Sequence, residues 1–284
     1  ATEEFSQGVS PFAAWSTGGS LGTAITYLTG AGTQTAGLSI GGDLTAATEE
    51  YNGSAWTAGG ALPATKRQLA SAGLQTSALA FGGMFPFSAA TYEYDGSSWA
   101  TGGSLGTARY SLAGCGTQTA GLGFGGYAPG ANSNSTEEYN GTAWTGGGNM
   151  GTARRVLAGA GTQTAGLAFG GQIAPNTAAT EEYDGSSWTA GGNLVAANAG
   201  LAGAGIQTAA LGFGGSLPSI TAVTQQYDGS SWTTTASMNI GRAYLGGCGT
   251  TSAALGFGGS TPSATTATEE FDSYGPSTAT ITTT

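Results

Sequence analysis

Short runs of apolar and small residues alternate with turn-forming residues along the whole chain, and none continues at helical spacing for several turns. The clearest copy of this pattern predicts a first strand over Arg154–Ala160, a turn at residues 161–164, and a second strand over Ala165–Phe169. A third strand is expected at Thr180–Tyr183 and a fourth around Trp188. The chain is therefore predicted to be all-β.

The third and fourth strands are separated by Asp184-Gly185, which favours a tight hairpin because both central residues of such a turn need positive φ. The same Asp-Gly or Asn-Gly pair recurs at Asn52-Gly53, Asp95-Gly96, Asn140-Gly141 and Asp228-Gly229. We therefore expect antiparallel strands joined by short connections.

The pattern repeats with a period of about 44 residues, marked by tryptophans at positions 15, 56, 99, 144, 188 and 232. Six Gly-Gly pairs keep the same period, at residues 41–42, 82–83, 125–126, 170–171, 214–215 and 258–259. Four antiparallel strands in a repeat of this length form one propeller blade. The prediction is one domain over residues 1–284, a six-bladed β-propeller of four-stranded antiparallel blades. The blade units are residues 22–58, 63–101, 107–146, 152–190, 196–234, and 240–271 together with 11–17.

The two ends of the chain predict how the ring closes. Trp15 has no hairpin before it, and the last copy has no tryptophan, so we expect the strand of Trp15 to be the outer strand of the sixth blade. The third strand of that blade could come from Thr2–Phe5 or Thr268–Phe271, and the spacing from the last Gly-Gly pair favours the second. The tail at residues 277–284 alternates like one further strand.

Composition excludes several classes of function. A net charge of −10 with only six basic residues disfavours nucleic acid, and no apolar run reaches the roughly 18 residues that membrane insertion needs. The chain has no histidine, which removes His-dependent nucleophiles and His-ligated zinc. We therefore expect no enzyme activity, cofactor or metal. Cys115 and Cys248 occupy equivalent positions three copies apart, on opposite sides of a six-fold ring, and are expected to be free thiols.

Nearly all the variation in repeat length lies between the Gly-Gly pair and the third strand, where five residues stand in the first unit and nine in the third. Scaffolds keep their strands and vary their functional loops. These loops are expected to emerge on the same face of the propeller as the turns that lead into each first strand, and that face is the candidate binding surface. Phe85, Phe87 and Tyr127 lie in these loops. They are interpreted either as apolar or sugar-stacking contacts for a ligand, or as local packing of the loops on the ring.

A basic residue opens the first strand in most copies: Lys66, Arg109, Arg154 and Arg242, with Ile25 and Asn198 in the other two. These cations could hold an anionic glycan near the channel mouth, or they could pair with the glutamates of the third strand. The fifth copy favours ion pairs, because neutral Asn198 coincides with neutral Gln225-Gln226. The first copy argues against them, because Ile25 coincides with Glu49-Glu50.

The glutamate pairs, Glu49-Glu50, Glu137-Glu138 and Glu181-Glu182, are adjacent residues on a strand, so their side chains point to opposite faces. Such a pair does not converge on one substrate or one Ca²⁺ ion. The glutamates are therefore interpreted as solvated or salt-bridged residues.

The combination of Arg154, Gly170-Gly171, Tyr183 and Trp188, repeated along nearly the whole chain, resembles the kelch repeat. Arrays with GTQTAGLAFGG and TEEYDGSSW are similar to those in structural proteins of marine bacteriophages. The resemblance implies a virion-surface or extracellular attachment or decoration module on a tail, fibre or capsid. Its partners would be other virion proteins or a host surface glycan, and a homo-oligomer stays open.

The alternative is a secreted bacterial surface adhesin or carbohydrate-binding propeller. A glycan-active enzyme is the hypothesis that the sequence supports least. Galactose oxidase, a kelch-like enzyme, needs histidines that this chain lacks. Sialidases use an arginine triad, but Arg109, Arg154 and Arg242 occupy one repeated position, and the Asp184-to-Trp188 spacing differs from the sialidase Asp-box.

Overall fold

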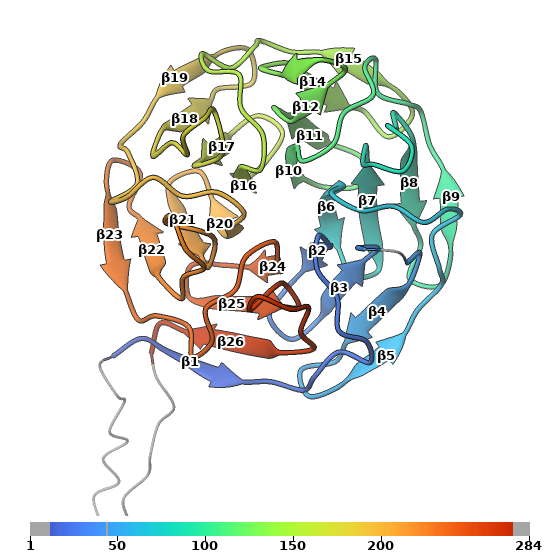
Figure 1. The fold of residues 1–284 in the computed structure, drawn as a ribbon. Coiled ribbons are helices and arrows are strands. Elements are labelled where there is room, and N and C mark those ends of the chain that lie inside the picture. The colour runs from blue at the N-terminus through green and yellow to red at the C-terminus, as the bar shows by residue number, and fades with distance from the viewer. Residues whose placement is uncertain (1–11, 44, 275–284) are drawn as a thin grey trace, which may run out of the picture.

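The computed structural model, which describes residues 12–43 and 45–274, is a ring of six four-stranded antiparallel sheets around a central axis (Figure 1). Among the described residues there is no helix. The predicted six-bladed propeller is thus confirmed. In every blade the strand that comes first in the sequence pattern lies nearest the axis, and the tryptophan strand forms the outer edge.

The strands of each blade follow in order from the axis outward. Blade 1 contains β2 (Thr29–Gly32), β3 (Gly37–Ile40), β4 (Thr48–Tyr51) and β5 (Trp56–Ala58). Blade 2 contains β6 (Ala70–Leu74), β7 (Ser77–Phe81), β8 (Thr91–Tyr94) and β9 (Trp99–Thr101). Blade 3 contains β10 (Ala113–Gly116), β11 (Gly121–Phe124), β14 (Thr136–Tyr139) and β15 (Trp144–Gly146).

Blade 4 contains β16 (Ala158–Gly161), β17 (Gly166–Phe169), β18 (Thr180–Tyr183) and β19 (Trp188–Ala190). Blade 5 contains β20 (Ala202–Ile206), β21 (Ala209–Phe213), β22 (Thr224–Tyr227) and β23 (Trp232–Thr235). Blade 6 contains β24 (Gly246–Gly249), β25 (Ala253–Phe257), β26 (Thr268–Asp272) and, from the other end of the chain, β1 (Ala14–Thr17).

The ring closes as predicted, because β1 pairs with β26 and places Trp15 opposite Phe271. The third strand of this blade comes from residues 268–272, as the spacing had favoured. Thr2–Phe5 and the tail at residues 277–284 lie outside the described residues. Closure by β1 also means that blade 6 has no hairpin between its third and outer strands.

The prediction for the inner strand was wrong at its start. The expected strand over Arg154–Ala160 is observed only from Ala158. Before it, Arg155 forms an isolated bridge with Gln172, and Val156 has a φ of 56°, which lies in the left-handed region. The chain therefore turns sharply at the channel mouth before it enters the blade.

Val156 belongs to a ring of six equivalent residues, one per blade, that all have positive φ: Tyr27, Gln68, Ser111, Val156, Gly200 and Tyr244. The N–H of each donates to the carbonyl of its counterpart in the preceding blade, at 2.8–3.0 Å, and the Tyr27 N–H closes the circle on Tyr244 O. Five of these residues have a side chain, for which this conformation costs about 1 kcal/mol or more. The closed circle of hydrogen bonds holds them there.

The Asp-Gly connection is a hairpin at the predicted place but with a different loop. Tyr183 pairs with Trp188, so the loop has four residues, and within it only Gly185 has positive φ. Asp184 Oδ1 accepts hydrogen bonds from the backbone N–H groups of Ser186 and Ser187, both at 2.8 Å. The aspartate thus stabilises the loop through its side chain, as in an Asx turn.

Each tryptophan packs into the wedge between its own blade and the preceding one. Trp188 lies 5.0 Å from the ring of Tyr183 in its own blade and 5.0 Å from the ring of Phe124 in blade 3. Its Nε1–H donates to Thr136 Oγ1 at 2.8 Å. All six tryptophans donate to the equivalent threonine of the preceding blade: Thr224, Thr268, Thr48, Thr91, Thr136 and Thr180.

A second contact between blades joins a buried tyrosine to the last glutamate on the third strand of the preceding blade. Tyr183 Oη donates to Glu138 Oε1 at 2.6 Å. The equivalent bonds are Tyr51–Glu270, Tyr94–Glu50, Tyr139–Glu93 and Tyr227–Glu182, each at 2.5 Å. A third contact comes from the turn after the inner strand, where Gln163 Nε2 donates to Gly121 O and Tyr139 O of the preceding blade.

These tyrosines predict an alkaline transition. Burial, together with the hydrogen bond to glutamate, raises the pKa of Tyr51, Tyr94, Tyr139, Tyr183 and Tyr227 to about 12. Because the folded-state pKa lies above the unfolded value of about 10, the stabilisation is complete below pH 10 and is lost as pH rises through 12. We expect these tyrosinates to appear near pH 12 in an ultraviolet titration, and Tyr183→Phe to remove one of them. Titration of every tyrosine near pH 10 in the folded protein would contradict this.

Candidate binding surface on the loop face

The loops between the second and third strands lie on the same end of the ring as the entries to the inner strands, as predicted. Isolated backbone bridges join the two, for example Arg67 to Met84 and Arg155 to Gln172. The longest loop, in blade 3, contains its own short hairpin of β12 (Tyr127–Ala128) and β13 (Ala131–Asn132). We call this end of the ring the loop face.

Two of the three aromatic residues singled out in the sequence lie together on the loop face. Phe87 lies 5.0 Å from the ring of Tyr110 and 6.4 Å from that of Tyr127, and the two tyrosine rings are 5.4 Å apart. We call Phe87, Tyr110 and Tyr127 the aromatic cluster. Phe87 is 38% exposed and both tyrosines are partly exposed, so local packing does not remove the cluster from solvent.

Two arginines that the sequence analysis did not single out stack on these loops. The guanidinium of Arg155 lies over the Tyr127 ring at 5.0 Å, and its Nε–H donates to Gln172 Oε1 at 2.9 Å. Arg67 lies over Phe85 at 4.4 Å and forms an ion pair with Asp43 at 2.6 Å. Among the described residues no carboxylate forms an ion pair with Arg155. Its guanidinium is thus a half-buried cation at the edge of the aromatic cluster.

A signal for these residues was present in the sequence. Arg67, Tyr110 and Arg155 each directly follow one of the basic residues that open the inner strand. Adjacent side chains in an extended segment point in opposite directions. Once the first residue of each pair is assigned to the interior of a blade, the second must lie on the loop face.

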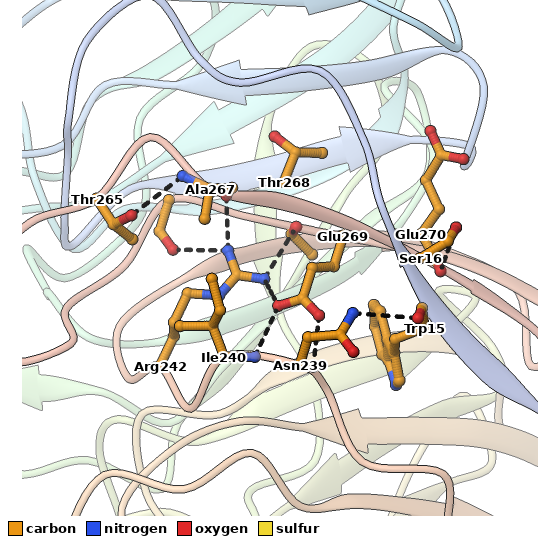
Figure 2. Close-up of polar contacts among 12 residues, drawn as sticks. Trp15, Ser16, Asn239, Ile240, Arg242, Thr265, Ala267, Thr268, Glu269 and Glu270 are labelled. Atoms are coloured by element: carbon orange, nitrogen blue, oxygen red, sulfur yellow. Dashed lines mark hydrogen bonds and ion pairs between the residues drawn. The ribbon is translucent and has the colours of Figure 1, made fainter.

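Three of the predicted ligand-binding residues, Arg109, Arg154 and Arg242, are fully buried instead of lining the loop face. Each pairs with the first glutamate of its own blade: Arg109–Glu137 at 2.8 Å, Arg154–Glu181 at 3.1 Å and Arg242–Glu269 at 3.0 Å. Figure 2 shows Arg242, which also donates to Gly258 O and Ala267 O. The ion-pair interpretation is therefore confirmed for these three arginines, whose side chains offer no surface to a glycan. Lys66 forms no ion pair among the described residues, and its Nζ donates to Phe85 O instead.

Burial disfavours the charged form of these guanidinium groups and lowers their pKa, to about 10 for Arg154. The other copies satisfy the same position differently. Asn198 donates to Gly214 O and accepts from the Ser216 N–H, while Gln225 accepts from the Val195 N–H. In blade 1, Glu49 accepts from the Gly22 N–H without a basic partner. Lys66 is buried too, and desolvation lowers its pKa.

The glutamate pairs diverge as the strand geometry predicted. Glu137 points inward to Arg109, whereas Glu138 points to the next blade and accepts from Tyr183. The two carboxylates of a pair therefore serve two different structural contacts. Within the described residues, histidine, cysteine, aspartate and glutamate side chains nowhere gather in threes that could hold a metal ion.

Below the loop face, the six inner strands surround a central cavity of about 310 Å³. Its walls are mainly glycine, alanine and one leucine from each blade, and the ring of positive-φ residues from Tyr27 to Tyr244 lines it at the mouth. A second groove, of about 650 Å³, lies between the loops of blades 4 and 5, where Pro175, Asn176, Leu217 and Pro218 contribute to its walls. The loop face is thus hollowed at its centre and between these two blades.

Both cysteines are free, as predicted, and both are buried. Burial raises the pKa of Cys115 and of Cys248 to about 12, so at neutral pH both are protonated. A protonated, enclosed thiol is a poor nucleophile. In the part of the chain that the structure covers, no helix has the length and apolar character needed to cross a membrane.

Comparison with known proteins adds no family assignment, because no protein-family model and no curated protein matches this chain.

Proposed function

We propose that this chain is a non-enzymatic binding propeller that recognises its ligand through the loop face. The observation that carries the proposal is the aromatic cluster of Phe87, Tyr110 and Tyr127 with Arg155 at its edge. The other arginines of the chain are occupied by carboxylates, whereas no carboxylate among the described residues pairs with Arg155. An exposed aromatic surface beside an available cation is typical of a recognition site.

The chemistry of the cluster supports a host glycan as the ligand. Partly exposed aromatic rings offer flat apolar surface to the C–H faces of sugars, and the guanidinium offers paired donors to carboxylate or hydroxyl oxygens. Asn132 and Asn176 occupy neighbouring loops, although their amides already donate to Gln172 O and Ser216 O. A partner subunit with an acidic, apolar contact patch would meet the same surface chemistry.

We further propose the kelch type for this propeller and a place on a virus particle, as a tail-fibre or capsid decoration. The repeat spacing and the motifs described above support this assignment. The low charge and scarcity of lysine suit a surface that avoids indiscriminate adhesion. Mass spectrometry of purified particles would test it, and finding the chain only in a cell-surface or secreted fraction would favour the bacterial adhesin.

A glycan array tests the recognition site directly. Replacing Phe85, Phe87 and Tyr127 together by alanine is expected to reduce binding by about 5- to 150-fold, because about 1–3 kcal/mol of stacking and burial is removed. The matched control is Leu74→Ala with Ile206→Ala, since both residues are more than half exposed at the hairpins on the opposite face. The proposal is wrong if wild type and triple variant bind equally, or if the wild type binds no glycan and no partner subunit.

A further inference from the structure

The interface between blades 5 and 6 lacks polar contacts that the five other interfaces share. The tyrosine–glutamate bond is missing there, because Phe271 stands where the other blades have tyrosine and Gln226 stands where they have glutamate. The glutamine of the inner turn is replaced by Thr251. In the described structure no side chain of this turn donates to the carbonyls of Ala210 and Tyr227, the equivalents of those bound elsewhere.

A backbone contact is missing at the same interface. In the other five blades a Gly-Gly pair follows the outer strand, and a Cβ on its second glycine would lie 2.0–2.2 Å from a carbonyl of the next hairpin, as Gly192 would from Ser230 O. Blade 5 has Thr235-Ala236 instead. These side chains fit because blade 6 has no such hairpin and Phe271 has no hydroxyl.

Some contacts persist at this interface. Trp15 donates to Thr224 Oγ1, Tyr244 N–H donates to Gly200 O, and Gly215 N–H donates to Arg242 O. Two further bonds attach β1 to the segment that connects blades 5 and 6. Asn239 Nδ2 donates to Trp15 O (Figure 2), and Trp15 Nε1 donates to Ala236 O. That segment is covalently linked to both blades and follows them when they separate. These bonds therefore do not replace the missing tyrosine–glutamate and glutamine contacts.

We infer that the ring opens at this interface, which we call the seam, before it opens anywhere else. Separation at the seam breaks no strand pair, because β1 and β26 both belong to blade 6 and move together. The segment from Ala236 to Leu245 is long enough to act as the hinge. Opening of the seam is a conformational change that the ring can undergo. It exposes the channel and the adjoining loops of blades 5 and 6 to solvent.

Native-state hydrogen exchange of the full chain tests the seam. Tyr244 and Gly215 report on it, and the matched amides Val156 and Gly126, which donate to Ser111 O and Arg154 O, report on the interface of blades 3 and 4. We expect protection factors at the seam to be at least tenfold lower. Equal protection at the two interfaces would overturn the inference.

Two single substitutions provide a matched pair. Thr251→Gln restores the glutamine that binds the carbonyls of the preceding blade at the other interfaces. It is expected to slow amide exchange of Tyr244 and Gly215 about tenfold, which corresponds to about 1.4 kcal/mol. Gln163→Thr copies the seam into the interface of blades 3 and 4 and is expected to speed exchange of Val156 and Gly126 by a similar factor. The inference fails if Thr251→Gln leaves the seam amides unchanged. The triple variant Q226E/T235G/F271Y, which rebuilds the second contact, should slow the same two amides.

Discussion

Gly203→Val is expected to destabilise the propeller by about 3 kcal/mol, the upper end of the cost of overpacking a core. Gly203 lies on the inner strand of blade 5, where a Cβ would stand 2.5 Å from the carbonyl oxygen of Gly159 and 2.9 Å from the Phe169 ring. The first of these neighbours is backbone and cannot rotate away. The inner strands would therefore have to separate, and urea unfolding would show a lower midpoint.

Gly146→Val is the matched control, because Gly146 ends an outer strand and a Cβ there meets no atom within 4 Å. The same substitution at that site is expected to change stability by no more than about 0.5 kcal/mol. Similar losses at both positions would show that crowding at the axis is not the cause of the destabilisation.

Ser71 of blade 2 occupies the position equivalent to Gly203, and there its hydroxyl donates to Gly30 O at 2.7 Å.

Arg109→Ala is expected to cost about 3–5 kcal/mol, as for other buried ion pairs that lose one partner. The substitution leaves the buried carboxylate of Glu137 without its cation and removes the donor for Gly125 O and Ser135 O. Urea unfolding at neutral pH measures the loss. A change below 1 kcal/mol would mean that water replaces the guanidinium in the blade.

Blade 5 supplies the compensating variant for this experiment. The double substitution R109N/E137Q reproduces the neutral arrangement of Asn198 and Gln225 and is expected to recover at least half of the stability lost in Arg109→Ala. If the double variant is as unstable as the single one, charge is not the reason that the two positions change together.

The parts of the structure that the sequence predicted are those in which one copy could be compared with another. Trp15 was assigned to blade 6 because its copy lacks a hairpin, and the arginine–glutamate pairs were favoured because Asn198 and Gln225 differ together. The tyrosine–glutamate contact was missed because its partners belong to neighbouring copies. Comparing Gln226 with Phe271, instead of with residues of its own repeat, would have revealed it.

Other features of the structure cannot be predicted from the type of residue. The left-handed conformation at the channel mouth is shared by Gln68, Val156 and Gly200, whose intrinsic preferences differ widely. It is imposed by the hydrogen bond that each of these residues donates to the preceding blade, so the closed ring must exist before the conformation is favourable. The left-handed residue Val156 interrupts the segment, and its sequence gives no sign of this. The inner strand was therefore predicted to start at Arg154, although its pairing begins only at Ala158.

The circle of hydrogen bonds around the mouth is made by main-chain atoms alone. The circumference of this backbone circle is therefore independent of which amino acids stand at those six positions. Related chains can exchange the side chains on this rim one at a time and alter what the rim attracts, while the backbone circle and the blades behind it keep their dimensions.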